Sequence, residues 1–163
     1  MAEVRAFLPL ATVVVACAAL AGCGGDGKDA TTTTQAGPLT HQQLISRGNQ
    51  ICIDTDRAVQ QLGQPVWNGD YWGKYVPLSE DALKKMGALT PPTKDKERFD
   101  EMMRFARREV DAIAEIRDLV NAGKLGRAQT KVRVATSLDT KVKFAARDVG
   151  FGFCSQLLSN WPA

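Results

Sequence analysis

The strongest constraint on the fold is the spacing of apolar residues after residue 40, which repeats every three or four positions almost to the end of the chain. This spacing predicts amphipathic helices, because residues three and four apart lie on one face of an α-helix. No run of alternating polar and apolar residues is long enough to indicate a strand. The pattern therefore predicts an all-α domain.

Glycine and proline divide the periodic region into four helical segments. The predicted helices span residues 40–62, 71–89, 93–121 and 125–149. Thr40 and Gln43 form a capping-box pattern at the first start, and Gly63 is a natural stop for that helix. Pro77 lies inside the second segment, so we expect a kink or a break there. Four helices joined by short turns predict an antiparallel up-down four-helix bundle.

The first 22 residues have the features of a bacterial secretory signal. Arg5 gives a weakly positive start, and the segment from Ala6 to Leu20 is apolar except for Pro9. This run is shorter than the ~20 residues that a membrane-spanning helix needs, but it fits the apolar core of a signal peptide. Leu20-Ala21-Gly22-Cys23 resembles the lipobox of bacterial lipoproteins, in which the cysteine thiol carries a diacylglyceryl group.

Three other interpretations of this region stay open. Val14-Val15-Ala16-Cys17 fits the lipobox loosely, but cleavage there would leave an apolar mature start. An ordinary signal cut near Ala21 would leave Cys23 without lipid, and an uncleaved membrane helix is the third alternative. We favour lipidation of Cys23, because the chain becomes polar immediately after it.

The lipobox divides the chain into three parts: a lipoprotein signal peptide (residues 1–22), a lipidated cysteine with a flexible tether (23–38) and a helical bundle domain (39–163). The tether is rich in Gly, Thr and Asp and has too little apolar surface to fold. Two acyl chains such as palmitate would hold the domain on the extracytoplasmic face of the cell membrane without a transmembrane helix. The net charge of +3 gives no indication of a nucleic-acid partner.

The four cysteines predict one disulfide. Cys17 leaves with the signal peptide, and Cys23 is alkylated by lipid. Cys52 and Cys154 remain, and in an oxidising compartment we expect them to form a disulfide, with the last helix lying beside the first. A metal site on the same two cysteines would need further ligands, for which the sequence shows no pattern.

A cluster of aromatic residues precedes and opens the second predicted helix. Its members are Trp67, Tyr71, Trp72 and Tyr75. Such a cluster can fill the end of a bundle, or it can stack a sugar or hold an apolar ligand. We favour the packing role and keep these four residues as the candidate ligand-binding set.

Other candidates for chemistry have weaker support. His41 is the only histidine and is expected on the solvated face of the first helix, without a partner. Asp111, Glu115 and Asp118 share one helix face, which suits a cation or acid–base chemistry but is more typical of a solvated surface. We expect no metal, no cofactor and no enzymatic activity.

The chain resembles a broad group of uncharacterised small lipoproteins of high-GC Gram-positive bacteria. The shared marks are the lipobox at 20–23, Ile51-Cys52, Leu89-Thr90-Pro91-Pro92 and the Gly150-x-x-x-Cys154 spacing. The resemblance implies a helical domain and supplies no catalytic residues. In the tail Ser155–Ala163, we expect Leu157, Leu158 and Trp161 to close over the end of the bundle.

These features predict a membrane-anchored, non-enzymatic lipoprotein whose helical domain binds or supports another envelope component, either a protein or a polymer. The alternative is a lipoprotein that binds a small ligand in an aromatic pocket near Trp67–Tyr75.

Overall fold

The computed structural model describes residues 37–156 of the chain. The predicted signal, Cys23, the tether up to residue 36, and Leu157, Leu158 and Trp161 lie outside the described residues. Residues 35–163 cluster as one compact unit. No helix within 37–156 combines the length and the apolar character needed to cross a membrane.

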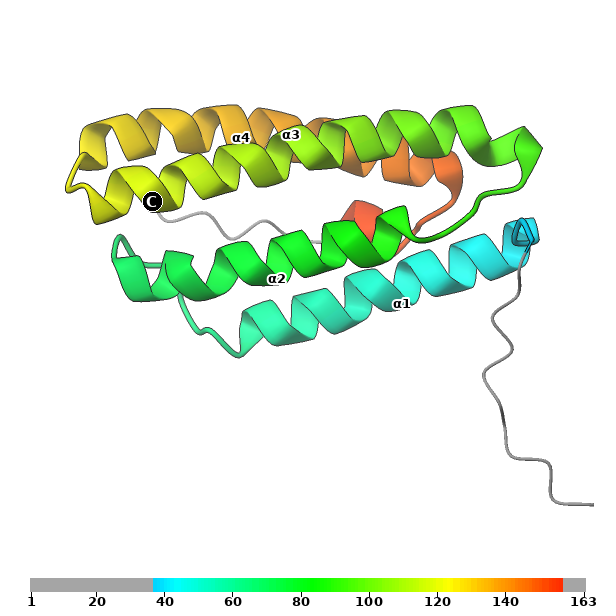
Figure 1. Cartoon of the computed structure of the whole chain (residues 1–163), viewed down its shortest axis with the longest axis horizontal. Helices are drawn as coiled ribbons and strands as arrows, with labels where there is room; N and C mark the ends of the chain where they lie inside the picture. Colours follow the sequence, from blue (N-terminus) through cyan, green and yellow to red (C-terminus); the bar gives the residue numbers. More distant parts are fainter. Residues whose placement is uncertain (1–36, 157–163) are drawn as a thin grey trace, which may run out of the picture. The chain divides into compact units, whose positions relative to one another are not determined.

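Four long helices make up the described domain, and no strand occurs among residues 37–156. They are α1 (His41–Gln60), α2 (Gly69–Gly87), α3 (Lys96–Asn121) and α4 (Leu125–Val149), with two short 3₁₀ turns, η1 (Thr93–Asp95) and η2 (Cys154–Gln156). Successive helices run in opposite directions (Figure 1). The predicted all-α, antiparallel four-helix bundle is therefore confirmed.

The helix starts and stops follow local capping chemistry. The Thr40 hydroxyl accepts a hydrogen bond from the Gln43 amide at 3.2 Å, and the Gln43 side chain accepts one from the Thr40 amide at 2.9 Å. Asn68 caps α2 by accepting from the Tyr71 amide at 2.8 Å. Gly150 ends α4 with a φ of 101°, a left-handed conformation that glycine adopts at low cost.

A kink or a break was predicted at Pro77, and the break does not occur, because α2 continues from Gly69 to Gly87 without interruption. Proline at this position removes the hydrogen bond to the carbonyl of Gly73, four residues earlier. Both Pro77 and Gly73 are exposed, so water can satisfy that carbonyl. The cost of the proline is therefore small enough for tertiary packing to keep the helix intact.

The His41 side chain is 39% exposed, in line with the predicted surface position, but it also has a partner that was not predicted. Its Nδ1 lies 2.7 Å from an Oδ2 of Asp95, whose side chain is 1% exposed, and Arg98 donates to the other oxygen of that carboxylate at 3.1 Å. The Leu39 amide donates to the Thr90 carbonyl at 2.9 Å. These contacts tie the start of α1 to the segment between α2 and α3.

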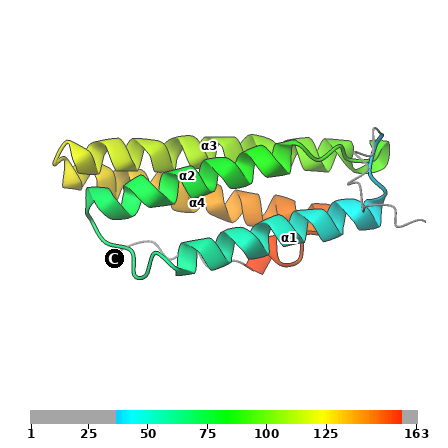
Figure 2. The same ribbon diagram turned by 60° about the horizontal axis from the view of Figure 1, so that its bottom comes forward.

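The helices do not all pack on one another equally. The helices α3 and α4 lie side by side along their lengths, α2 packs on α3, and α1 packs on α2 (Figures 1 and 2). The backbone of α1 approaches α4 chiefly through the η2 turn, which contacts both helices. The C-terminal end of α4 does lie beside α1, as expected, because Gly150 faces Ile45 and Leu44 shares a core cluster with Ala146 and Val149.

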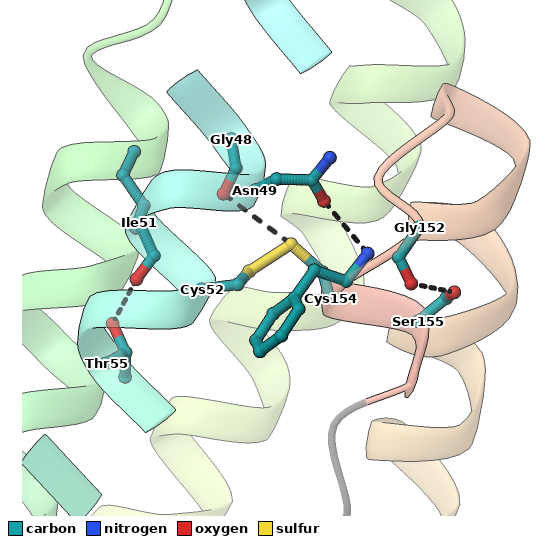
Figure 3. Close-up of a disulfide and its surroundings, with 9 residues drawn as sticks. Gly48, Asn49, Ile51, Cys52, Thr55, Gly152, Cys154 and Ser155 are labelled. Atoms are coloured by element: carbon teal, nitrogen blue, oxygen red, sulfur yellow. Dashed lines mark hydrogen bonds between the residues drawn. A yellow bond between two sulfur atoms is a disulfide. The ribbon is translucent and has the colours of Figure 1, made fainter. Parts of the chain in front are cut away.

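The predicted disulfide between Cys52 and Cys154 is confirmed, with an S–S distance of 2.11 Å and a Cα–Cα distance of 5.4 Å. Figure 3 shows it joining the middle of α1 to the start of η2. Beside it, the Phe153 amide donates to the Asn49 side-chain oxygen at 3.0 Å. The buried ring of Phe151 packs against Gly48 of α1 and meets Phe99 edge-on at 6.3 Å.

We predict that Gly48→Ala destabilises the domain. A Cβ at this position would lie 2.6 Å from two ring carbons of Phe151, so the ring or α1 must shift. Such overpacking costs roughly 1–3 kcal/mol of unfolding free energy, measured by urea denaturation with the disulfide intact.

Gly126→Ala is the matched control, because a Cβ at this helical glycine meets no heavy atom within 4 Å. This variant is expected to be as stable as the parent chain or slightly more stable. Equal stability of the Gly48→Ala variant and the parent would contradict the tight contact with Phe151.

Candidate ligand-binding cavity

A cavity of about 210 Å³ lies inside the bundle and is lined by all four helices and Cys154. Its wall is mainly apolar. The apolar lining residues are Ile51, Val59, Ala82, Leu83, Met86, Met102, Met103, Ala106, Val110, Ile113, Val142 and Ala146. The polar lining side chains are Thr55, Asp56, Tyr75, Ser79, Glu109, Asp139 and Lys143.

The position of α1 explains why a cavity exists here. The η2 turn contacts both α1 and α4, and few direct backbone contacts join these two helices. Ile51, Val59 and Val142 line the resulting space and are only partly buried, although they lie on inward faces. Apolar side chains that face inward but keep contact with solvent favour the binding of something that covers them.

Polar side chains line the cavity from all four helices, and α4 supplies an ion pair. Asp139 and Lys143 lie one helical turn apart and form an ion pair with Nζ 2.9 Å from Oδ2. Their side chains are 14% and 24% exposed, so the pair is largely shielded from water. Glu109 of α3 lines the same cavity and is only partly exposed.

The environment of Glu109 favours its protonated form. Burial is the main reason that the pKa of this carboxyl rises to about 8, and the nearby negative charge of Asp139 raises it further. The positive charge of Lys143 acts in the opposite direction but is weaker. The cavity therefore holds a neutral carboxylic acid beside an ion pair at neutral pH, a combination that is more frequent at functional sites than elsewhere.

Tyr75 supplies a phenol to the same space. Its pKa is raised, first by burial and then by Glu109, so the hydroxyl stays protonated and can donate a hydrogen bond. The Tyr75 ring stacks on Tyr71 with centroids 5.8 Å apart. It thus connects the cavity to the aromatic cluster.

The four aromatic residues predicted as a ligand-binding set are in mutual contact, but they do not share one role. The Trp72 ring lies 5.6 Å from Tyr71, 5.9 Å from Tyr75 and 6.1 Å from Trp67. Tyr71 and Trp72 are buried in the core cluster that includes Ile116 of α3. Only Tyr75 lines the cavity, while Trp67, Tyr71 and Trp72 do not contribute to its wall.

The three carboxylates on one face of α3 lie outside the cavity. Asp111, Glu115 and Asp118 are exposed. Glu115 pairs with Lys131 of α4, and Asp118 pairs with Arg117 at 2.9 Å. Within the part of the chain that the structure describes, no group of three His, Cys, Asp or Glu side chains could hold a metal ion.

The sequence reasoning missed Glu109 and Asp139, although the helical spacing contains the signal. Glu109 lies four positions before the inward residue Ile113 and three after Ala106. Asp139 lies three positions before Val142 on α4, which also lines the cavity. A charged residue within the apolar stripe of a helix faces the core, so each position could have been recognised as a candidate.

We predict that the effect of Glu109→Gln on stability depends on pH. With a folded pKa of about 8 against an ordinary value of 4.5, Glu109 ionises first in the unfolded chain, so the parent loses stability between these pH values. The loss is at most about 1.4 kcal/mol per pH unit. The variant has no carboxyl group at position 109, so its stability does not include this loss. Its free energy of unfolding, measured by urea denaturation, should therefore rise relative to that of the parent as the pH increases from 5 to 8.

Glu115→Gln is the control for this experiment, because Glu115 lies on the same helix but on the exposed side. Its difference from the parent should be small and similar at pH 5 and pH 8. If Glu109→Gln also differed from the parent by the same amount at both pH values, the shifted pKa would be wrong.

Comparison with known proteins provides no identity for the chain. No protein-family model, no curated protein and no solved structure matches it significantly. The assignment of a function therefore depends on the geometry of the cavity.

Proposed function

We propose that this protein is a lipid-anchored, non-enzymatic binding protein of the cell envelope, whose helical domain holds a small, mainly apolar molecule in its interior cavity. The observation that carries the proposal is the cavity itself, a space of about 210 Å³ inside a bundle of this size. An apolar cavity of roughly 150 Å³ is large enough for benzene, so this space suits a ligand somewhat larger than one aromatic ring.

The polar groups in the cavity favour binding over catalysis. The Ser79 hydroxyl donates to the backbone oxygen of Tyr75 at 3.1 Å, so it is engaged in the helix. Cys52 and Cys154 are joined in the disulfide and offer no thiol. His41, the residue best suited to activate a nucleophile, pairs with Asp95 and is not among the residues that line the cavity.

Ligand binding is better supported than a role in holding an envelope protein or polymer. A large contiguous apolar patch on a protein surface marks a site of contact with another macromolecule. The exposed large apolar side chains of the described domain are Val66, Leu125, Val134, Phe144 and Phe153. Leu125, Val134 and Phe144 lie on α4, and successive members are nine or ten positions apart. Neighbours on one helix face are three or four positions apart, so these side chains do not form a contiguous patch along α4.

The proposed anchor is the lipid on Cys23. The lipobox Leu20-Ala21-Gly22-Cys23 supports it, and the polar segment after Cys23 supplies a tether of about a dozen residues before the compact unit begins at residue 35. On this proposal, the domain stands on the extracytoplasmic face of the membrane.

We predict that the full chain incorporates labelled palmitate in a bacterial host and sediments with its membranes, because the thioether on Cys23 carries the acyl chains. Cys23→Ser should abolish both properties, and Cys17→Ser should change neither. Labelling that survived in Cys23→Ser but was lost in Cys17→Ser would move the anchor to the earlier cysteine.

We predict that residues 35–163, when secreted from a bacterial host, carry a small molecule. This compact unit contains both cysteines of the disulfide and the whole cavity. Native mass spectrometry should show extra mass that disappears on denaturation. Ala106→Phe should remove it, because the new ring occupies space that Ala106 leaves open in the cavity wall.

The matched control is Ala122→Phe, the same substitution at an exposed residue after α3, which should keep the extra mass. Extra mass that remained in a folded Ala106→Phe variant would place the ligand elsewhere. A clean mass for every variant would favour the support of an envelope component instead.

A further inference from the structure

Two helical segments that line the cavity define a seam in its wall. The seam consists of the stretch from Cys52 to Val59 on α1 and the stretch from Asp139 to Ala146 on α4. Few direct backbone contacts join these two helices, and the η2 turn contacts both of them. Among residues 37–156, no element follows η2 that could extend this cover along the seam.

Apolar side chains of the seam keep contact with solvent. Val59 of α1 and Val142 of α4 line the cavity and are only partly buried, as is Ile51 next to the disulfide. Covering such side chains with another apolar group is favourable, because it removes their remaining surface from water. The seam therefore suits an apolar occupant.

The tail of the chain starts at this seam. Cys154 lines the cavity and is bonded to Cys52, and η2 ends two residues later at Gln156, so the chain leaves η2 next to the seam. At ~1.5 Å per residue, the α1 stretch of the seam is about 10 Å long. The segment from Leu157 to Trp161 can span up to about 17 Å when extended, so it is long enough to follow the whole seam.

The sequence of the tail has the composition that the seam requires. Leu157, Leu158 and Trp161 are large apolar residues, and no residue from 157 to 163 has a charged side chain. The spacing of these three residues allows them to share one side of a helical turn, with Ser159 and Asn160 on the other side. The segment can therefore cover apolar surface without placing a charge against it.

The indole of Trp161 also suits the polar groups of the seam. An indole N–H can only donate, and a buried indole usually finds an acceptor. The carboxyl groups of Asp56 and Asp139 line the cavity and lie within the two stretches that form the seam. The seam thus offers this side chain both an apolar wall and hydrogen-bond acceptors.

We propose that the seam is the docking site of the chain's own tail, with Leu157, Leu158 and Trp161 lying between α1 and α4 and closing the cavity on that side. This position differs from the end of the bundle, where the sequence alone predicts these residues. A molecule then has to pass the tail to enter or leave the cavity. The docking itself goes beyond the proposed function and does not require it, because the tail covers the seam whether or not the cavity holds a molecule.

Fluorine NMR of residues 35–163 labelled with fluorotryptophan tests the docking. The label gives one resonance each for Trp67, Trp72 and Trp161, and the variants Trp67→Phe and Trp161→Phe assign them. On transfer to heavy water, we expect the Trp161 resonance to move nearly as little as that of Trp72, which is 1% exposed. Free fluorotryptophan provides the shift for full exposure.

Two seam variants locate the tail. Val142→Ala on α4 and Val59→Ala on α1 each shorten a side chain of the cavity wall and should shift the Trp161 resonance. Val134→Ala is the matched control, because it makes the same change at a residue of α4 that is 46% exposed. The control should leave the Trp161 resonance unchanged.

A Trp161 resonance that responds to heavy water as free fluorotryptophan does would overturn the docking and leave the seam to another occupant. Shielding of Trp161 that disappears on dilution would assign the contact to a second copy of the chain and also overturn it. A shielded Trp161 that responds to neither seam variant would place the tail elsewhere on the domain. None of these results affects the proposed function, which native mass spectrometry of the same residues tests separately.

Discussion

The disulfide between α1 and η2 is the interaction on which the interior of this bundle depends. In a small helical domain, apolar faces pack together until little empty space remains. Here η2 contacts both α1 and α4, the buried Phe151 ring packs against Gly48 of α1, and the covalent bond fixes η2 to the middle of α1. The cavity is therefore a consequence of how the end of the chain is attached, rather than of weak packing throughout the core.

The acid placed in this cavity has an energetic cost that packing alone does not explain. A partly buried carboxyl group that keeps its proton at neutral pH reduces the stability of the folded state relative to an uncharged isostere. Proteins retain such groups where binding or chemistry requires them. The ion pair of Asp139 and Lys143 contributes to the same cavity wall, which is otherwise mainly apolar.

Much of the fold could be predicted from the sequence, because its determinants are local. The spacing of apolar residues located α4 to the residue, and the Thr40–Gln43 pattern located the start of α1. The disulfide followed from elimination among four cysteines. The pairing of His41 with Asp95 could not be predicted, since 54 positions separate the two residues and only the packing of the segment before α3 against α1 brings them together.

The candidate site was less predictable for a related reason. The aromatic cluster was visible in the sequence, but its division into core residues and one cavity residue depends on the direction in which α2 presents each ring. The position of Glu109 within an apolar stripe was also visible. However, the effect of Asp139 on the pKa of Glu109 could not be predicted, because Asp139 lies on a different helix and only the fold brings both residues to the same cavity.

The disulfide also limits the order in which the fold can be completed. Cys52 and Cys154 are separated by 102 positions, so nearly the entire domain has to be synthesised before the bond can form. The contacts between α3 and α4 are close in sequence and can form earlier, as local contacts generally do. Oxidation is then the step that links α1 covalently to the hairpin of α3 and α4 through η2, and a compartment that keeps thiols reduced would leave the four helices without that link.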